Sequence, residues 1–410
     1  MNLKEYKNTL LKMSMIKSLL KNLHPSSIEH LRLTMDLLKR KIQSSNERAI
    51  KFEDWMSEAL YNPFFGYYTS KKDIIFNGRN STDNNINGDF VTAPELTPIF
   101  AKTLSRQIAQ VLNYLESENI IEFGAGSGIL AKNILQEFKK LGLNINYKII
   151  EISNSLISTQ KQTLSSFNDK VEWLSSLPIG FNGCVIANEL LDAMPVSIFH
   201  YSKNKSIMEK WVGLNQREEF VWIDKPADNR LLEATKKILP LIECDYTSEI
   251  NFQSDAWIRT IPKWLTRGVV FIIDYGFPRH EYYHLQRATG TLMCHLNHIA
   301  YSDPFIAPGI QDITSHVDFS SIAEASIENG LYVLGYTSLA NFLINSGIIH
   351  IVQDLDKSKI KNHVEELGAV QKLLSEIDMG ELFKVIAIGK DFQNELVGFS
   401  ENDRSHKLLP

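Results

Sequence analysis

The chain has 410 residues, enough for two domains of ordinary size or for one domain with large insertions. Hydrophobic residues make up 44% and charged residues 22%, which excludes a disordered, collagen-like or coiled-coil chain. The formal net charge of −5 is unevenly spread, because residues 1–50 carry +6 and the rest of the chain carries −11. Nucleic-acid binding needs clustered Lys and Arg, so the acidic body predicts no nucleic-acid partner.

The three cysteines, Cys184, Cys244 and Cys294, lie far apart and form no CxxC pair. A zinc ribbon or a thioredoxin-type redox centre is therefore not expected, and the sparse count suits a reducing compartment. No stretch approaches the ~20 apolar residues that a membrane span needs, so no integral membrane segment is predicted.

Residues 1–45 are predicted to form a helical N-terminal extension, because leucines and methionines recur there at helix-like intervals with lysines between them. Packing on the body, a mitochondrial presequence, and a basic amphipathic helix on a membrane surface or partner are all open. Glu5, Glu29 and Asp36 speak against the presequence, since presequences are poor in acidic residues.

Residues 46–118 form the next segment, with helices expected at 52–60 and 98–115. An aromatic-rich turn at 61–68 and a polar, asparagine-rich loop at 77–88 separate these two helices.

From residue 119 onward, strands alternate with helices, which is typical of βαβ units and predicts an α/β fold with a parallel sheet. The predicted segments are a first core part (119–196), an insertion (197–266), a second core part with a lid loop (267–390) and a tail (391–410). The expected core strands are 119–123, 147–152, 171–174, 184–187, 269–273, 331–336 and 383–388, with helices at 129–141, 154–166 and 357–377. The expected insertion contains antiparallel strands at 197–201, 208–214 and 219–223 and helices at 229–238 and 253–266.

The strongest motif is the glycine turn, defined as Glu122-Phe123-Gly124-Ala125-Gly126-Ser127-Gly128, between an expected strand and an expected helix. Glycines let the backbone approach a ligand closely, and the helix N-terminus offers free N–H groups. A dinucleotide-binding turn has the pattern GxGxxG, but its third glycine would fall at Ile129. The observed E-x-G-x-G-x-G pattern is instead the signature of methyltransferases that bind S-adenosylmethionine on a doubly wound sheet.

Glu151 ends the next expected strand, where a carboxylate can accept hydrogen bonds from both hydroxyls of a ribose. An NAD-binding site would place an acidic residue in the same position, so Glu151 does not discriminate between the two cofactors.

A second polar group follows the apolar run that ends at Ala187. Asn188, Glu189 and Asp192 lie there, and ligands of open α/β sheets bind at the carboxyl ends of strands. Carboxylates at this position can orient a nucleophilic nitrogen. Arginine would need them, because its guanidinium stays charged at ordinary pH. A helix-capping role for the same residues is the structural alternative.

These motifs, between about Ile50 and Lys390, resemble the MidA-like methyltransferases, a family that includes the mitochondrial arginine methyltransferase needed to assemble respiratory complex I. The resemblance rests on the glycine turn and on Gly66-Tyr67-Tyr68, the stretch 88–95, Asn188–Val196, Asp274-Tyr275-Gly276 and Ala307–Phe319.

The resemblance implies a class I methyltransferase-type doubly wound sheet with an antiparallel and helical insertion, the helical N-terminal extension, and residues 46–118 covering cofactor and substrate. It implies S-adenosylmethionine as cofactor, bound by Glu122, Gly124, Ala125, Gly126, Gly128, Glu151, Ile152, Thr92 and Glu95. It implies Glu189, Asp192 and Asn188 as catalytic residues. The substrate would meet Tyr67, Tyr68, Asp89, Phe90, Asp274, Tyr275 and His316.

The expected activity is methylation of arginine on a protein substrate, with a respiratory-complex subunit as one candidate. A non-catalytic, cofactor-binding assembly chaperone and a methyltransferase for small molecules are the alternatives. Similarity to bacterial members favours the cytoplasm, with the mitochondrial matrix as the alternative, and a homodimer is one expected arrangement. His295 and His298 have a spacing that can serve metals, but nothing nearby supplies a firm third ligand, so no metal site is predicted.

Overall fold

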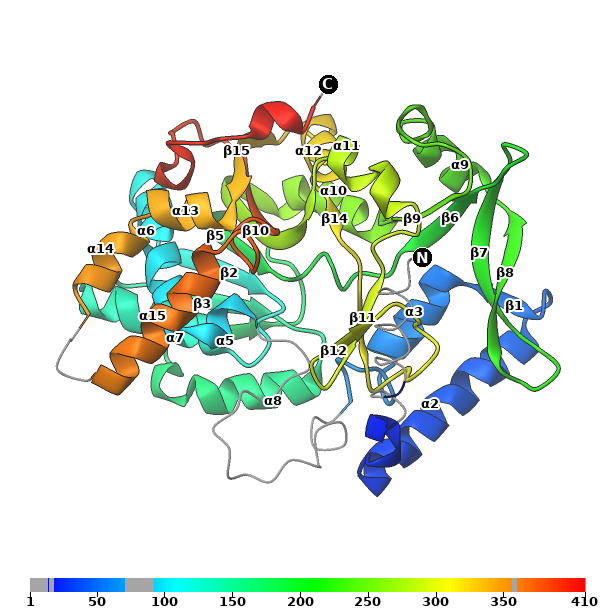
Figure 1. Ribbon diagram of the computed structural model, residues 1–410. Coiled ribbons are helices and arrows are strands. Elements are labelled where there is room, and N and C mark those ends of the chain that lie inside the picture. The colour runs from blue at the N-terminus through cyan, green and yellow to red at the C-terminus, as the bar shows by residue number, and fades with distance from the viewer. Residues whose placement is uncertain (1–13, 15–17, 71–91, 356–359, 410) are drawn as a thin grey trace. The chain divides into compact units, whose positions relative to one another are not determined.

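The computed structural model describes residues 14, 18–70, 92–355 and 360–409 (Figure 1). The chain divides into two compact units that are each assembled from three segments. Unit 1 comprises Met1–Val91, Pro195–Ile250 and Leu285–Ser315, and unit 2 comprises Thr92–Met194, Asn251–His284 and His316–Pro410.

Unit 2 is built around one eight-stranded sheet with helices between the strands. Its strands are β2 (Asn119–Phe123), β3 (Asn146–Ile150), β4 (Val171–Leu174), β5 (Phe181–Asn188), β10 (Leu265–Phe277), β14 (Val317–Asp318), β15 (Tyr332–Ser338) and β16 (Phe383–Lys390). Its α-helices are α5 (Ala93–Leu96), α6 (Pro98–Leu115), α7 (Ile129–Lys140), α8 (Asn154–Thr163), α10 (Phe252–Trp264), α11 (Arg279–Tyr282), α12 (Phe319–Glu328), α13 (Leu339–Asn345), α14 (Ile348–Gln353) and α15 (Ile360–Leu374).

The strand order of this sheet is β15-β16-β10-β5-β2-β3-β4, with β14 beside β10. From β2 the chain moves outward through β3 and β4, then returns to β5 on the other side of β2 and continues to β10. Strands β4, β3, β2, β5 and β10 run parallel to one another, whereas β16 runs antiparallel to both β10 and β15. The order of the strands therefore reverses between β2 and β5, which confirms the predicted α/β class with a doubly wound sheet.

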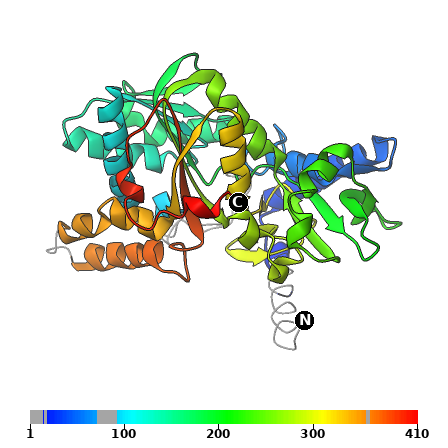
Figure 2. The ribbon, with the colours of Figure 1, turned by 90° about the horizontal axis from the view of Figure 1, so that it is seen from above.

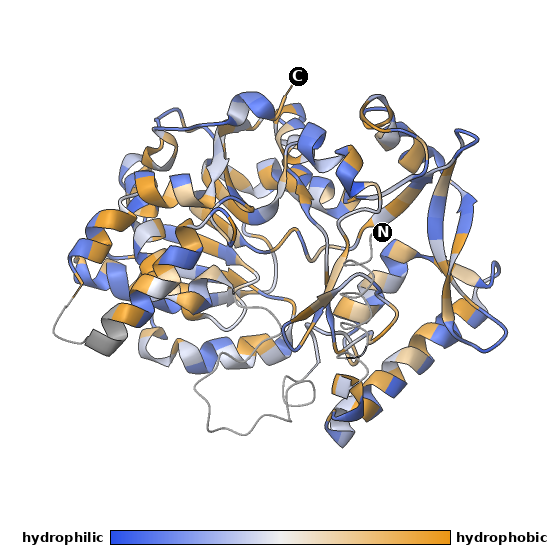
Figure 3. Cartoon of the chain, in the orientation of Figure 1, coloured by the Kyte–Doolittle hydropathy of each residue, from blue (hydrophilic) through white to orange (hydrophobic). Residues whose placement is uncertain are grey.

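Alternating side chains of the central strands enter two separate cores, as expected for a sheet that is buried on both faces. Val269, Phe271 and Ile273 of β10 pack with residues of α6, α7, α13 and α14. Val270 and Ile272 pack with residues of α10 and α12. Figure 2 shows helices on both sides of the sheet, and Figure 3 shows that several helices are hydrophobic on one side and hydrophilic on the other.

Unit 1 contains a five-stranded sheet of order β1-β7-β6-β9, with β8 beside β7, and a three-stranded sheet of order β12-β11-β13. Its strands are β1 (Ala49–Lys51), β6 (Ser197–Tyr201), β7 (Ile207–Leu214), β8 (Phe220–Pro226), β9 (Tyr246–Ile250), β11 (Met293–Leu296), β12 (Ile299–Tyr301) and β13 (Asp312–Thr314). Its α-helices are α2 (Pro25–Ser44), α3 (Phe52–Tyr61) and α9 (Asn229–Thr235).

The N-terminal helices and the insertion share one core in unit 1. Leu38 and Ile42 of α2 are fully buried there, and Trp55 of α3 lies edge-on to the rings of Phe220 and Phe305. Of the arrangements open for the predicted extension, packing on the body is therefore the one found for its helix α2, which lies against unit 1. The first 13 residues and the polar loop at 77–88 lie outside the described residues.

The division in space differs from the predicted segments at three places. The segment expected at 46–118 is split, because its part from Thr92 onward belongs to unit 2. The helix expected at 253–266 in the insertion is α10, which lies in unit 2, and residues 285–315 of the expected second core part lie in unit 1. The antiparallel strands expected in the insertion are present as β6, β7 and β8.

Strands β5 and β10 approach each other too closely for a side chain at Gly268. A Cβ there would lie 2.1 Å from the backbone oxygen of Gly183. We expect Gly268→Ala to lower the free energy of unfolding by about 2–3 kcal/mol, measured by urea denaturation, because the strands must separate to admit the methyl group. The control is Gly368→Ala in α15, where a Cβ meets nothing within 4 Å. That change should stabilise by ~0.5–1 kcal/mol, since alanine favours helix. Equal stability of the two variants would contradict the close packing.

Candidate active site

The carboxyl ends of four parallel strands lie level with one another at one edge of the unit 2 sheet. Phe123 of β2 pairs with Ile150 of β3 and with Ala187 of β5, and Asn188 pairs with Ile273 of β10. The polar residues that follow these strands therefore gather beside the point where the strand order reverses, which is where ligands of such sheets bind.

The glycine turn connects β2 to α7 with three left-handed glycines. A Cβ on Gly124 would lie 3.2 Å from Cδ1 of Leu190, and one on Gly128 would lie 3.3 Å from Cα of Gln160, so neighbouring segments enclose both positions. Gly126 differs, because at φ +53° a Cβ there would meet no described atom within 4 Å. Ala125, between them, is buried. The turn is thus fixed at its ends and open at Gly126.

A short helix before the sheet holds the turn from one side. Ser127 donates a hydrogen bond from its hydroxyl to Glu95 of α5, and the same hydroxyl accepts one from the N–H of Ile129. Thr92 is the N-cap residue of α5, although its side chain makes no capping bond. Glu95, which the resemblance assigns to the cofactor, therefore contacts the glycine turn itself.

Glu151 follows β3 and is held by two donors. Its Oε1 accepts the N–H of Ser153 at 3.0 Å, and its Oε2 accepts the amide of Gln160 at 3.0 Å. The amide of Gln160 also donates to the carbonyl of Gly126 at 3.1 Å, so one side chain joins Glu151 to the turn. The next residue, Ile152, is 65% exposed, which leaves an apolar side chain beside the site for a flat ligand to cover.

Glu122 lies inside the fold. Its carboxylate is 2% exposed and accepts a hydrogen bond from the hydroxyl of Tyr147 at 2.8 Å. Burial, with a smaller effect from the charge of Glu151, raises the pKa of Glu122 to about 7, while the bond from Tyr147 opposes the rise. Its contact with a cofactor stays a prediction, and its observed partner is Tyr147.

The segment after β5, residues 189–192, is called the acidic loop. Asn188 donates to Glu189 at 3.2 Å, and both side chains are partly exposed, whereas Asp192 is 5% exposed. The backbone of Glu189 is left-handed, with φ 49°. A residue other than glycine or asparagine rarely adopts this conformation, and such strain tends to occur at functional sites. Contact of Glu189 with a ligand stays a prediction.

Asp274 of β10 anchors the acidic loop. Its Oδ2 accepts the N–H groups of Leu191 at 2.9 Å and Asp192 at 3.2 Å, and its Oδ1 accepts the N–H of Tyr275. Asp274 is fully buried, so desolvation raises its pKa to about 8, and the nearby charge of Glu189 adds to the rise. The described residues between β5 and β6 contain no helix for these side chains to cap, and the acidic loop is held from the neighbouring strand.

The predicted substrate residues fall into three groups. Asp274, Tyr275 and His316 lie together in unit 2, with the rings of Tyr275 and His316 5.2 Å apart. Tyr67 and Tyr68 belong to unit 1, where Tyr68 donates to Asp312 at 2.6 Å. Asp89 and Phe90 lie outside the described residues.

Several site residues were missed by the sequence reasoning. Gln160, Ser127 and Asn251 hold the site: the amide of Asn251 donates to the carbonyl of Leu191 at 2.9 Å and so braces the acidic loop. One signal was present for Gln160, because a polar residue four places after the buried Leu156 falls on the same face of a helix. No sequence pattern linked Asn251, 60 residues away, to the acidic loop.

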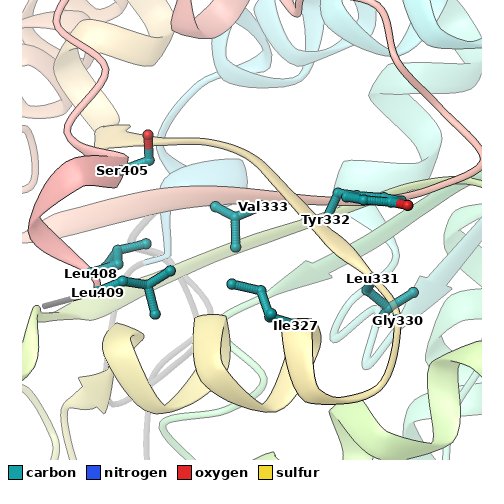
Figure 4. A pocket seen from close by; sticks show the side chains of 8 residues that line it. All are labelled: Ile327, Gly330, Leu331, Tyr332, Val333, Ser405, Leu408 and Leu409. Carbon is teal, nitrogen blue, oxygen red and sulfur yellow. The ribbon is translucent and has the colours of Figure 1, made fainter.

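The partly open pocket in Figure 4 is a separate feature. This cavity of about 520 Å³ is lined by Ile327, Gly330, Leu331, Tyr332, Val333, Ser405, Leu408 and Leu409. It lies at the start of β15, which runs parallel to β10, and therefore at the sheet edge opposite the glycine turn.

Within the described residues, no cluster of three or more His, Cys, Asp or Glu could hold a metal ion. No helix among them is long and apolar enough to cross a bilayer.

Comparison with known proteins gives concordant results. The model of a family described as an S-adenosyl-L-methionine-dependent methyltransferase matches residues 103–337, more than half of the chain. A crystal structure from Burkholderia thailandensis with bound S-adenosyl-homocysteine is 39% identical, with a TM-score of 0.85, and covers 93% of this chain and 98% of that one.

Two curated relatives are more distant. The Caenorhabditis elegans "Protein arginine methyltransferase NDUFAF7 homolog, mitochondrial" is 26% identical over 398 residues, covering 89% of this chain and 87% of the relative. The human "Protein arginine methyltransferase NDUFAF7, mitochondrial" is 26% identical over 424 residues, covering 89% of each. These likenesses confirm the resemblance predicted from the motifs.

The cofactor is S-adenosylmethionine. The described residues fit it, because the turn is open at Gly126, a carboxylate follows β3, and the N-terminus of α7 adjoins both. Which side chains contact it stays a proposal.

The open space at Gly126 yields a first test of the site. We expect Gly126→Val to abolish binding of S-adenosylmethionine in calorimetry, because a branched side chain would fill the space. Gly142→Val is the matched control, since Gly142 has φ +68° and equally open surroundings but lies after α7, at the opposite end of the helix. Both changes carry a similar backbone cost, about 1–2 kcal/mol, so only the position differs. Unchanged affinity in Gly126→Val would refute the assignment.

The buried Asp274 yields a pH prediction. Its folded-state pKa of about 8 lies above the ordinary ~3.9, so its contribution to stability is full below about pH 4 and is lost as the pH rises through 8. We expect the wild type to lose at least ~1 kcal/mol more unfolding free energy between pH 5 and 9 than Asp274→Asn does. The exposed Asp378→Asn serves as control and should follow the wild type. Parallel pH curves for wild type and Asp274→Asn would show that burial does not hold the proton.

Proposed function

Since the chain belongs to the family of S-adenosyl-L-methionine-dependent methyltransferases, we propose that it methylates arginine on a protein substrate, with Glu189 as the residue that receives the guanidinium. The observation that carries the proposal is the acidic loop, because a partly exposed, left-handed glutamate lies there in a loop whose Leu191 and Asp192 N–H groups are bound by the buried Asp274 of the neighbouring strand. The names of the curated relatives at about 26% identity support arginine as the target.

The charge of the site agrees with a cationic substrate. Glu189, Asp192 and Asp274 lie within one loop and the adjoining strand end, and the loop is braced by Asn251. A guanidinium stays protonated at ordinary pH, so carboxylates must hold it and take up a proton as its nitrogen attacks. A cationic substrate would gain most from the carboxylates of Glu189 and Asp192, and it would also favour the ionised form of Asp274, whose pKa burial raises to about 8.

This arrangement suggests a separate role for the cofactor and for each carboxyl group. The bound cofactor supplies an activated methyl group. Glu189 orients the guanidinium so that one nitrogen lies in line with the methyl carbon, and alignment of this kind lowers the barrier of a displacement. As the new N–C bond forms, the C–S bond breaks with its electron pair going to sulfur, and Glu189 accepts the proton that leaves the nitrogen. Asp274 and Asp192 keep the loop in position.

The location of the protein in the cell, its substrate and its oligomeric state stay proposals. The curated relatives are named mitochondrial proteins, which favours the mitochondrial matrix, the alternative location, over the cytoplasm. A protein subunit of a respiratory complex stays one candidate substrate. A homodimer is likewise a prediction.

The roles of the acidic loop can be separated from cofactor binding. We expect Glu189→Gln to bind S-adenosylmethionine within about twofold of wild type and to lose at least ~100-fold in methyl transfer, because general-base assistance is removed while the cofactor contacts stay. Asp192→Asn should lose less, since its side chain is buried. The exposed Glu376→Gln is the control.

Methyl transfer would be measured by mass spectrometry of methylarginines on proteins from cells that lack this chain, incubated with the purified variants and isotope-labelled cofactor. Label on another residue type or on small molecules would refute arginine as the target. Cellular assembly of a partner complex by Glu189→Gln that is as good as wild type would favour the chaperone role instead.

A further inference from the structure

Gln160 occupies a central position in the cofactor half of the site. It lies on the inner face of α8 and is fully buried. Its side chain reaches three segments that are distant in sequence: the glycine turn, the residue after β3, and Trp173 of β4. Burying an amide costs free energy unless its oxygen and nitrogen both form hydrogen bonds, and these three bonds satisfy both atoms of Gln160.

Trp173 decides which way the amide faces. The indole Nε1 is a donor only, and it lies 2.9 Å from Oε1 of Gln160, which must be the acceptor. The amide nitrogen of Gln160 is then turned toward the carbonyl of Gly126 at 3.1 Å and toward Oε2 of Glu151 at 3.0 Å. A flipped amide would place an N–H against a donor and an oxygen against two acceptors, so only one orientation is stable.

This orientation fixes the carboxylate of Glu151. The N–H of Ser153 binds Oε1 and the amide of Gln160 binds Oε2, so donors at both oxygens define the plane of the carboxylate. The same amide sets the position of Gly126, the open residue of the turn, relative to that carboxylate. A ligand that spans from the turn to Glu151 therefore meets two features whose separation is set by one side chain.

We propose that Gln160 is a positioning residue of the cofactor site, which holds Glu151 in the orientation that accepts the ribose hydroxyls of the adenosyl group. The proposal rests on the assignment of Glu151 to the ribose and does not depend on arginine being the methyl acceptor. A purely structural role is the competing explanation, in which Gln160 only satisfies buried polar groups and keeps α8 in place.

The two explanations differ in how they affect ligands with and without a ribose hydroxyl. The probes are S-adenosylhomocysteine and its 2′-deoxy analogue, titrated by calorimetry into the full chain. The wild type should prefer the hydroxylated ligand by about tenfold or more, because a hydrogen bond to a charged group is lost in the analogue. Gln160→Leu removes the amide oxygen and the amide nitrogen at similar side-chain volume. We expect the preference to fall below about twofold, because the affinity for S-adenosylhomocysteine falls while that for the 2′-deoxy analogue does not.

Matched variants make the result specific. Gln162→Leu, two residues along the same helix and exposed, should keep the full preference. Glu151→Ala should lose the preference, and the double variant Gln160→Leu with Glu151→Ala should lose no more than either single variant, because both act through one contact. Trp173→Phe keeps the amide but removes the donor that orients it, so it should reduce the preference in part. This last variant also tests the proposal if Gln160→Leu does not fold.

Two results would overturn the proposal. Equal weakening of both ligands by Gln160→Leu and by Trp173→Phe, with the preference intact, would reduce Gln160 to a structural residue. An intact preference in Glu151→Ala, which removes both acceptor oxygens, would show that Glu151 does not bind the ribose, and the positioning role would fall with it. Neither readout involves methyl transfer, so failure of the arginine assignment would leave these measurements unaffected.

Discussion

Strands β5 and β10 lie so close together that a Cβ on Gly268 would touch the backbone of Gly183, and the register between these strands decides where the reacting groups are placed. That register pairs Asn188 with Ile273, so Glu189 begins the acidic loop beside Asp274 and its N–H reaches the carbonyl of Ile273 at 2.8 Å. A slip of one residue would send each side chain to the opposite face. The hydrogen bonds from Leu191 and Asp192 to Asp274 can therefore form only in the observed register.

Buried carboxyl groups make this edge of the sheet unusual. Glu122 and Asp274 are almost fully buried, and burial raises the pKa of each, to about 7 and about 8. Both accept hydrogen bonds from the fold itself, Glu122 from Tyr147 and Asp274 from three backbone N–H groups. A cation nearby would stabilise the ionised form of both carboxyl groups, because an opposite charge favours that form. A sulfonium cofactor and a cationic substrate would both supply one.

Much of the fold could be predicted from local pattern. The run Val269–Ile273 is apolar on both faces, which is typical of a central strand, and the spacing of Gly124, Gly126 and Gly128 indicated a ligand-binding turn. The site was predictable where its residues directly follow strands, as Glu151 and Glu189 do. It was not predictable where a side chain acts across the sequence. Asn251 and Gln160 are ordinary polar residues in helical surroundings, and only their distant hydrogen-bond partners distinguish them.

The sequence by itself determined the α/β class, the cofactor and the family, because strand periodicity and a glycine turn are written in consecutive residues. The tertiary structure alone decided that α2 and the insertion share one core, that α10 belongs with the sheet, and that Asp274 holds the acidic loop. The physical reason is the distance along the sequence over which each kind of interaction acts. Propensity and periodicity act within about ten residues, whereas burial and hydrogen bonding between Leu191 and Asp274 join positions 83 residues apart.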